Sequence, residues 1–318
     1  KLLILSMTIT QLEYIIALAK YENFLEASKH CFITQPTLSI QVQKLEEYLG
    51  VTIFDRSKKP LKPTLIGKRI IEQAKVIIRE YKRIEEILME SKNVLEGEFR
   101  LGIIPTVSVS LLPIFLKSFT EKYPKIKLVL SELQTEEMIK KLQNDEIDGG
   151  IASTPLNDPL IIEKPLYLEP FSLFIHPENP LFQKKDIKEV DLVDQEILLM
   201  NEGHCFRNQV TQICKIRKNK GIFFESGSFQ TLISLVEQNL GITLLPYLVT
   251  ENIKLPKQKQ MIRKISGITP SRQISLIYRR KHLKEGIMSA LEKSIISSLP
   301  KSLIDLSDES NKIISPNF

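Results

Sequence analysis

The sequence predicts a mixed fold, with short helices at the N-terminus, one long helix after them and an α/β region over most of the remainder. Three observations predict it. Apolar residues recur at helical spacing over residues 12–49, and a long apolar seam follows over residues 65–90. From about residue 96, short apolar runs typical of strands alternate with helical patterns. With 318 residues, the chain is long enough for two or three domains.

The composition is that of an ordinary globular protein, with 42% hydrophobic and 26% charged residues. No stretch approaches the roughly 20 apolar residues of a membrane span. Gln11 and Glu13 interrupt the apolar start, so we expect neither a signal peptide nor a membrane partner. Three cysteines, an odd number, do not make an extracellular disulfide framework, which favours a cytoplasmic location. The net charge of +6 permits an anionic partner without requiring one.

The first 50 residues have the pattern of short helices joined by tight turns. One helix is expected around residues 12–19 and a second around residues 24–31. A third begins after Thr34, a suitable N-cap, tolerates Pro36 in its first turn and ends at Gly50. Its apolar face repeats every three or four residues, at Leu38, Val42, Leu45 and Leu49.

The second and third of these helices have the arrangement of a helix-turn-helix, in which the front of the later helix enters the major groove of DNA. Gln side chains can bind adenine with two hydrogen bonds, and Ser or Thr can reach several base edges. A basic stretch with Pro60 and Pro63 as breakers follows and suits a two-stranded wing on phosphates. The candidate DNA-binding residues are Gln35, Pro36, Thr37, Ser39, Gln43, Lys44, Arg56, Lys58 and Lys59. An ordinary helical hairpin with a solvated charged face explains the same pattern.

A long helix is predicted over residues 65–90, because its apolar residues step by three and four positions. An exposed seam of this length has to be buried, most simply against a second copy of the chain. Such a dimer would present two recognition helices to two half-sites. The seam consists of Ile66, Ile70, Ala74, Ile77, Tyr81, Ile84 and Leu88.

The remainder alternates strand and helix patterns, which argues for a parallel α/β sheet. Strands are expected over residues 99–104, 126–130, 171–175, 196–200, 242–245 and 274–278, and one begins at residue 149. Helices are expected over residues 110–122, 136–144 and 231–239, with a last one after residue 278. Binding sites in such folds lie at the carboxyl ends of strands, often in a crevice between subdomains.

A long ordered series of motifs resembles the LysR-type transcriptional regulators. The matching residues are Gln11-Leu12-Glu13-Tyr14, Phe24…Ala27-Ser28, Thr34-Gln35-Pro36-Thr37-Leu38-Ser39, Val42…Lys44-Leu45-Glu46, Leu49-Gly50, Phe54-Asp55-Arg56 and Thr64…Gly67. The resemblance implies an all-α winged helix-turn-helix at residues 1–64 and a long linker and dimerisation helix at 65–95. It also implies an α/β regulatory domain at 96–300, made of two Rossmann-like subdomains as in periplasmic binding proteins.

The same resemblance places subdomain I at about 96–169 plus 274–300 and subdomain II at about 170–273. It implies a DNA-binding regulator rather than an enzyme, a homodimer or homotetramer, with double-stranded promoter DNA and RNA polymerase as partners. Residues 1–6 lie before the usual start of the family and are expected to be an extension or a start-site artefact. The tail at 301–318 lies outside the resemblance, and we expect it to be disordered.

Two of the three cysteines, Cys205 and Cys214, lie nine positions apart, and the first follows His204 and precedes Arg207. Neighbouring cations favour the reactive thiolate, and a second thiol can trap an oxidised first one as a disulfide. We therefore predict a redox switch, with Cys205 at a helix N-terminus. A continuous helix would hold the two Cα atoms about 13.5 Å apart, whereas a disulfide needs roughly 4.4–6.8 Å. Disulfide formation would thus require the segment to unwind.

Five further motifs resemble the peroxide-sensing OxyR branch of the LysR-type regulators. They are Gly203-His204-Cys205-x-Arg207-x-Gln209, Ile104-Pro105-Thr106-Val107, Gln134-Thr135, Gly241-Ile242-Thr243-Leu244-Leu245-Pro246 and Ile277-Tyr278-Arg279. The resemblance implies that hydrogen peroxide oxidises Cys205, that Cys214 resolves it to a disulfide, and that antioxidant genes respond. It implies a glutaredoxin- or thioredoxin-type reductant and no cofactor. The implied peroxide pocket consists of Thr106, Thr135, His204, Arg207, Asn208 and Arg279.

Asn208 departs from the branch, which usually has Asp there, and so removes a negative charge three positions after Cys205. Two rival functions remain. A LysR-type regulator of a small metabolite could carry incidental cysteines, or the chain could be a thiol peroxidase, against which the complete DNA-binding segment argues. A zinc site at His204, Cys205 and Cys214 lacks a fourth ligand nearby, so we expect no metal.

Overall fold

The computed structural model describes residues 7–90, 95–193, 195–214, 225–267, 269–279, 284–304 and 311–316. The chain divides into two compact units, Lys1–Lys92 and Asn93–Phe318. The expected extension at residues 1–6 lies outside the described residues. Within the described ranges, no helix is both long enough and apolar enough to cross a membrane.

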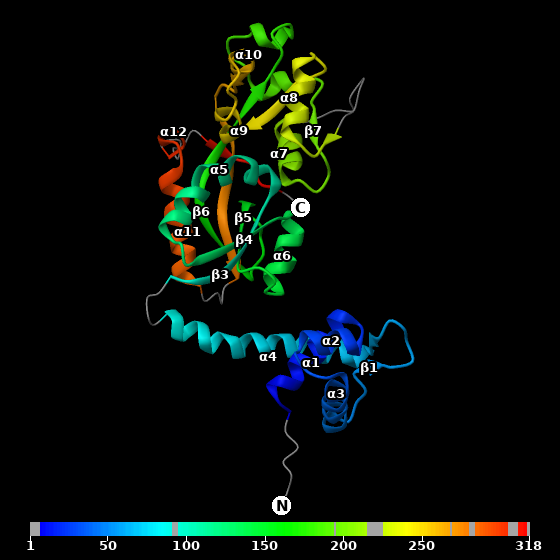
Figure 1. The fold of residues 1–318 in the computed structure, drawn as a ribbon. Helices are drawn as coiled ribbons and strands as arrows, with labels where there is room; N and C mark the ends of the chain where they lie inside the picture. The colour runs from blue at the N-terminus through cyan, green and yellow to red at the C-terminus, as the bar shows by residue number, and fades with distance from the viewer. Residues whose placement is uncertain are drawn as a thin grey trace, which may run out of the picture. The chain divides into compact units, whose positions relative to one another are not determined.

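The first unit contains the helices and the wing that the sequence predicts (Figure 1). Thr34 caps the third helix by accepting a hydrogen bond from Thr37 N, and Gly50 ends it with a φ of 67°. Leu38, Val42 and Leu45 are buried in the core of this unit. Its elements are α1 (Ile9–Tyr21), α2 (Phe24–His30), α3 (Gln35–Leu49), the antiparallel strands β1 (Phe54–Asp55) and β2 (Lys62–Pro63), and α4 (Leu65–Glu90).

The apolar seam of α4 is divided between two roles. Ala74 is buried, and Ile70 and Ile77 pack against the core of the first unit. The seam omitted two further core residues of the helix, Ile71 and Ile78. Ile66, Tyr81 and Ile84 stay 40%, 49% and 59% exposed, and the side chain of Leu88 lies outside the described residues. The prediction of one continuous exposed seam was therefore wrong for its middle, from Ile70 to Ile77, which packs in the unit's own core.

The second unit is built on a curved sheet with helices around it (Figure 1). Its strands are β3 (Gly97–Ile103), β4 (Ile126–Glu132), β5 (Gly149–Thr154), β6 (Ile161–Phe174), β7 (Leu199–Met200), β8 (Glu225–Ser226), β9 (Thr243–Pro246), β10 (Ile262–Lys264), β11 (Thr269–Arg279) and β12 (Asn311–Ile313). Its α-helices are α5 (Pro105–Lys122), α6 (Thr135–Gln143), α7 (Cys205–Cys214), α8 (Phe229–Glu237), α9 (Tyr247–Glu251), α10 (Pro256–Lys259), α11 (Glu285–Ser298) and α12 (Lys301–Ile304). Two 3₁₀ turns, Pro180–Gln183 and Glu189–Leu192, lie between β6 and β7.

The main sheet is mixed, so the expectation of an all-parallel sheet was wrong. Its order is β10-β6-β11-β5-β3-β4, in which β4, β3 and β5 run parallel to one another and the pairs β5–β11, β11–β6 and β6–β10 are antiparallel. The long strands β6 and β11 are antiparallel neighbours. The sequence showed only the most apolar part of each, residues 171–175 and 274–278, because the remaining residues of both strands include prolines and charged residues, which are rare in strands.

Two hydrophobic cores lie along this sheet, and β6 contributes to both. Leu166 and Tyr167 belong to the first core, while Phe171 and Phe174 belong to the second. The division of this unit into two subdomains stays a prediction. Helix α5 begins at Pro105, five residues before its predicted start, because proline is well tolerated in a first turn. This earlier start places Thr106 in the first turn of α5.

The end of the chain is more ordered than predicted. Residues 311–316 are described, and β12 pairs in parallel with the beginning of β11, with Ser271 opposite Ile313. Ile314 and Pro316 are buried. The expectation of a disordered tail was therefore wrong for this segment, whose apolar residues are too few to give a sequence pattern.

Candidate functional site

The two candidate redox residues occupy opposite ends of one helix. Helix α7 begins at Cys205 and ends at Cys214, which confirms the predicted helix, and both cysteines are free thiols. Ten helical residues separate the Cα atoms by about 13.5 Å, too far for a disulfide. Gly203 makes the turn before α7 with a φ of 86°, and an added Cβ would lie 2.6 Å from the Gln134 side chain. The entry to α7 therefore requires glycine.

The two thiols lie in different hydrophobic cores. Cys205 is 4% exposed and belongs to the first core, whereas Cys214 is fully buried in the second. Burial, with a smaller contribution from Glu189, raises the pKa of Cys214 to about 12. Cys214 is therefore protonated at neutral pH and packs as a small apolar side chain.

Burial also raises the pKa of Cys205, and the positive charge of Arg272 is the largest effect that opposes it. Smaller opposing effects come from the Thr135 hydroxyl and from the backbone N–H groups of Phe206 and Cys205 at the start of α7. The resting thiol is thus mainly protonated at neutral pH. The cation beside it is Arg272, which the sequence did not single out.

Arg272 is completely buried and held by two partners. Its Nε and Nη2 lie 2.9 and 2.7 Å from Oε2 of the fully buried Glu169. Nη2 also donates to the carbonyl oxygen of Thr106, and Nη1 donates to the Thr106 hydroxyl, both at 3.0 Å. An arginine carries five N–H donors, and these contacts use at most four. Within the described part of the chain, at least one N–H of Arg272 is therefore left for a ligand.

Three further polar groups near Cys205 are buried and can bind a small polar molecule. Thr106 accepts from Arg272, so its hydroxyl hydrogen is free to donate. The Thr135 hydroxyl lowers the pKa of Cys205 but makes no hydrogen bond of ordinary geometry with the described residues. Gln209, one helical turn after Cys205, is fully buried, and its Oε1 likewise has no partner among the described residues.

The structure does not bring Arg279 to this site. Arg279 lies seven residues after Arg272 on β11, about 23 Å away at 3.3 Å per residue. Its Nη1 contacts Asp145 Oδ2 at 3.0 Å and the carbonyl oxygen of Gln143 at 3.4 Å. Two arginines on one strand made the choice ambiguous in sequence, and the full burial of Arg272 identifies it as the one beside Cys205.

The other expected pocket residues lie around the start of α7 with different roles. Burial lowers the pKa of His204, so this imidazole is neutral at pH 7 and adds no positive charge. Arg207 donates from Nη1 to the carbonyl oxygen of Met200 at 3.2 Å. Asn208 is half-buried, and its carbonyl oxygen accepts from Thr211. No group of three or more metal-binding side chains occurs among the described residues.

A crevice of about 420 Å³ opens beside Thr106. The first turn of α5 lines one side, and Ser228 and Gln230 at the start of α8 line another. Glu132 and Lys254 add charges of opposite sign. This space is large enough for a small metabolite.

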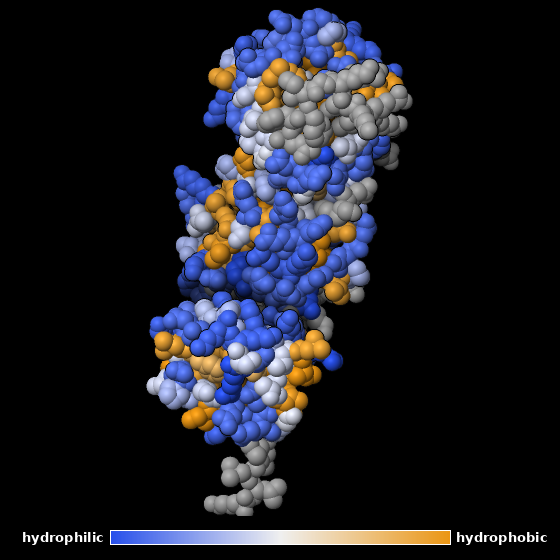
Figure 2. Space-filling view, turned by 90° about the vertical axis from the view of Figure 1, so that its right-hand side faces the viewer, coloured by the Kyte–Doolittle hydropathy of each residue, from blue (hydrophilic) through white to orange (hydrophobic). Residues whose placement is uncertain are grey.

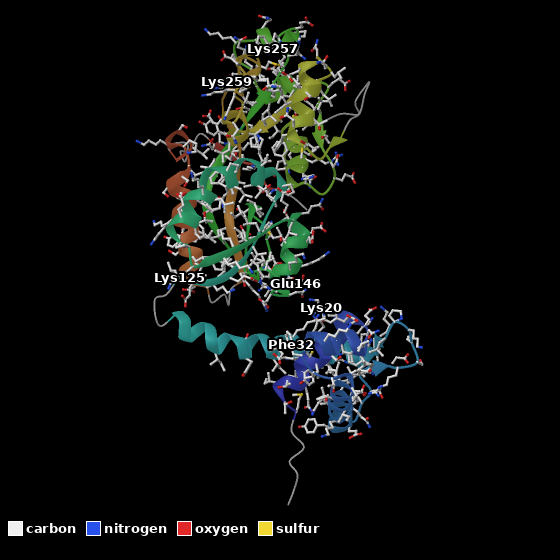
Figure 3. All side chains as sticks on the ribbon, viewed as in Figure 1. Lys20, Phe32, Lys125, Glu146, Lys257 and Lys259 are labelled. Atoms are coloured by element: carbon white, nitrogen blue, oxygen red, sulfur yellow. The ribbon has the colours of Figure 1, made fainter. Side chains whose placement is uncertain are left out.

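The candidate DNA-binding residues form an exposed polar surface on the first unit. Eight of the nine are exposed, six of them at the start of α3 and on the wing and two, Gln43 and Lys44, farther along the helix. Ser39 is half-buried. Glu46 ties α3 to the wing, because it accepts from Ile53 N at 2.7 Å and from Arg56 at 3.2 Å. Phe32, which is labelled in Figure 3, is 94% exposed in the turn between α2 and α3. Apolar patches also interrupt the hydrophilic surface in Figure 2.

Comparison with known proteins identifies the family. Residues 9–68 match the bacterial regulatory helix-turn-helix of the lysR family, and residues 92–293 match the LysR substrate binding domain. The chain belongs to the LysR family of transcriptional regulators. This family consists of DNA-binding regulators rather than enzymes, as the sequence predicted.

Within the LysR family, the chain is similar to OxyR proteins. It is 32% identical over 282 residues to the DNA-binding transcriptional dual regulator OxyR of Escherichia coli, covering 86% of this chain and 90% of that protein. It is 32% identical over 298 residues to the hydrogen peroxide-inducible genes activator of Haemophilus influenzae, covering 92% and 99%. A full-length OxyR variant from Pseudomonas aeruginosa has a similar structure, with a TM-score of 0.74, 31% identity and coverage of 92% and 98%.

Proposed function

We propose that this LysR-family regulator senses hydrogen peroxide through Cys205 and Cys214 and activates antioxidant genes from double-stranded promoter DNA. The observation that carries the proposal is the placement of both cysteines at opposite ends of α7, in two different cores. The similarity to hydrogen peroxide-inducible activators supports it. The proposal includes a cytoplasmic location, RNA polymerase as a partner and a glutaredoxin- or thioredoxin-type reductant.

The reaction begins at Cys205. Its thiolate attacks one oxygen of hydrogen peroxide, the O–O bond breaks, and the departing oxygen leaves as water after taking a proton. The product is a sulfenic acid at Cys205. The Thr106 hydroxyl and the remaining N–H of Arg272 are donors for the departing oxygen, and both side chains are buried.

Cys214 completes the reaction. Its sulfur attacks the sulfenic sulfur of Cys205, an S–S bond forms, and a second water leaves. Two thiols thus lose two electrons and two protons, and one peroxide becomes two waters. Because the Cα atoms start about 13.5 Å apart, α7 has to unwind and Cys214 has to leave the second core. This rearrangement is the proposed signal that repacks the regulatory domain and moves the DNA-binding helices.

The apolar residues that remain exposed on α4 suit a second copy of the chain. Ile66, Tyr81 and Ile84 leave an unpartnered apolar surface within the first unit. A homodimer or homotetramer that buries it would present two copies of α3 to DNA. Cross-linking and light scattering of wild type and Ile84→Glu test this part, and an unchanged size for the variant would contradict it.

DNA footprinting tests the function directly. The reduced protein, the peroxide-treated protein, and Cys205→Ser and Cys214→Ser are compared on the same promoter fragments. We expect peroxide to change the wild-type footprint and neither variant's, with circular dichroism showing loss of helix in the oxidised wild type. A Cys205→Ser variant that responds like the wild type would contradict the proposal.

The crevice beside Thr106 favours one alternative, a regulator that responds to a small metabolite. In that case, a metabolite would change DNA binding in wild type and Cys205→Ser alike. The footprints with Cys205→Ser therefore separate the two functions.

A further inference from the structure

The segment after α12 that the structure describes, residues 311–316, is built into the core beside α7. Strand β12 pairs with the start of β11, directly before Arg272. Ile314 N donates to the carbonyl oxygen of Ser271 at 2.8 Å. The Ile314 side chain is 5% exposed and lies in the same core as Cys214 and Val210. The segment is thus fixed to the sheet on one side and to the core of α7 on the other.

Two glutamines of α7 donate hydrogen bonds to the backbone of this segment. Gln209 Nε2 donates to the Ile314 carbonyl oxygen at 2.6 Å, and Gln212 Nε2 donates to the Ser315 carbonyl oxygen at 2.9 Å. The two glutamines are three residues apart, so they share one face only while α7 is helical. An extended α7 would separate their side chains and could not keep both bonds. These contacts are therefore specific for the helical form.

We propose that residues 311–316 act as a positioning element of the redox site, which holds α7 helical and is released when the Cys205–Cys214 disulfide forms. The release on disulfide formation rests on the proposed function, whereas the holding of α7 in its helical form does not. Contacts that stabilise the helical form oppose any reaction that needs it to unwind. The segment therefore sets how readily α7 opens, and it positions Gln209, whose buried Oε1 is available one turn after Cys205.

The release also has a structural consequence on the sheet. Along one edge of β11, β12 pairs with Thr269, Pro270 and Ser271, and β5 pairs with the residues from Gln273 onward. Displacement of β12 would expose backbone groups of β11 next to the Arg272 site. Oxidation at α7 would thereby change the hydrogen bonding of β11, a strand with which α7 forms no strand pairing.

Hydrogen–deuterium exchange of the full chain tests the release. Amide exchange of residues 311–316 is measured in reduced and peroxide-treated wild type, and disulfide formation is verified separately by the loss of two hydrogens in mass. We expect at least tenfold faster exchange in this segment after oxidation. Peroxide-treated Cys214→Ser, which can reach the sulfenic acid but no disulfide, is expected to keep the reduced rate. A disulfide that forms without any change in exchange overturns the inference, whereas absence of the disulfide overturns the proposed function.

The holding role is tested in the reduced protein, without peroxide. Gln212 is exposed, so Gln212→Ala removes its bond to the segment without opening the core. Thr211→Ala is the matched control, because the bond of the Thr211 hydroxyl that the described residues show stays within α7, to the carbonyl oxygen of Asn208. We expect α7 amides to exchange about two- to tenfold faster in Gln212→Ala than in the control, the range for one neutral hydrogen bond. Equal rates in the two variants overturn the holding role, whatever peroxide does.

Discussion

Arg272 donates a hydrogen bond to the hydroxyl of Thr106 at 3.0 Å, across 166 residues of sequence and between two buried side chains. The bond joins the middle of β11 to the first turn of α5. It leaves the Thr106 hydrogen free, and the same guanidinium lowers the pKa of Cys205. One arginine therefore links the charge beside the thiol with the hydroxyl that we propose as a donor to peroxide.

Arg272→Lys should slow oxidation of Cys205 by about 100-fold, because a lysine keeps the charge but cannot reach Glu169 and Thr106 together. The matched control is Arg279→Lys, on the same strand but paired with Asp145, which should react like the wild type. Stopped-flow measurement of the second-order rate with peroxide checks both. A larger effect from Arg279→Lys than from Arg272→Lys would show that Arg279 is the arginine of the peroxide site, as the sequence resemblance implied.

Glu169→Gln should destabilise the fold by about 3–5 kcal/mol, because it leaves the buried Arg272 charge without its partner. Glu292→Gln is the matched control. Glu292 pairs with Lys164, whose side chain is 45% exposed, so its loss should cost at most about 1 kcal/mol. Urea denaturation of the three reduced proteins measures both effects. Similar losses for the two variants would mean that the Glu169–Arg272 pair contributes no more than an exposed one.

Local signals made the first unit predictable from sequence. The caps of α3 at Thr34 and Gly50, and the breakers around the wing, depend on neighbours only a few residues away. The mixed sheet was not predictable in the same way. The pairing of β6 with β11 joins segments about 100 residues apart, and no local pattern records whether such strands run parallel or antiparallel.

The candidate site divides similarly. Helix α7 and the two cysteines at its ends were predictable from motif and spacing. Arg272 and Glu169 were missed because each is an ordinary charged residue in sequence, and only full burial shows that they form a pair. Full burial of a charged pair marks such residues, and burial is known only from a structure. The β12 contacts were missed because they use backbone carbonyl groups, which every residue has.

The oxidation rate should rise with pH. Burial raises the pKa of Cys205 above its ordinary value of 9.0, so below that pH the reactive thiolate fraction increases about tenfold per pH unit. We expect this slope from pH 6.5 to 8.5, without a plateau. Burial lowers the pKa of His204 below its ordinary value, so its titration falls toward the acidic end of this range, and the imidazole is mainly neutral at pH 7 and above. Cys214→Ser isolates the first step for the measurement, and a rate independent of pH above 6.5 would show a thiolate already formed at rest.

The affinity for DNA and its dependence on salt should distinguish residues that contact bases from residues that contact phosphates. Gln35→Ala, at the start of α3, should weaken binding to the promoter site by about 1–3 kcal/mol with little effect on unrelated DNA. Lys59→Ala, on the exposed wing, should weaken both and reduce the slope of log affinity against log salt by about one. Lys125→Ala, in the second unit and paired with Glu96, is the control and should change neither (Figure 3).

Titrations of promoter and random fragments at several salt concentrations measure these effects. A Lys59 variant with an unchanged salt slope would show that the wing does not neutralise a phosphate.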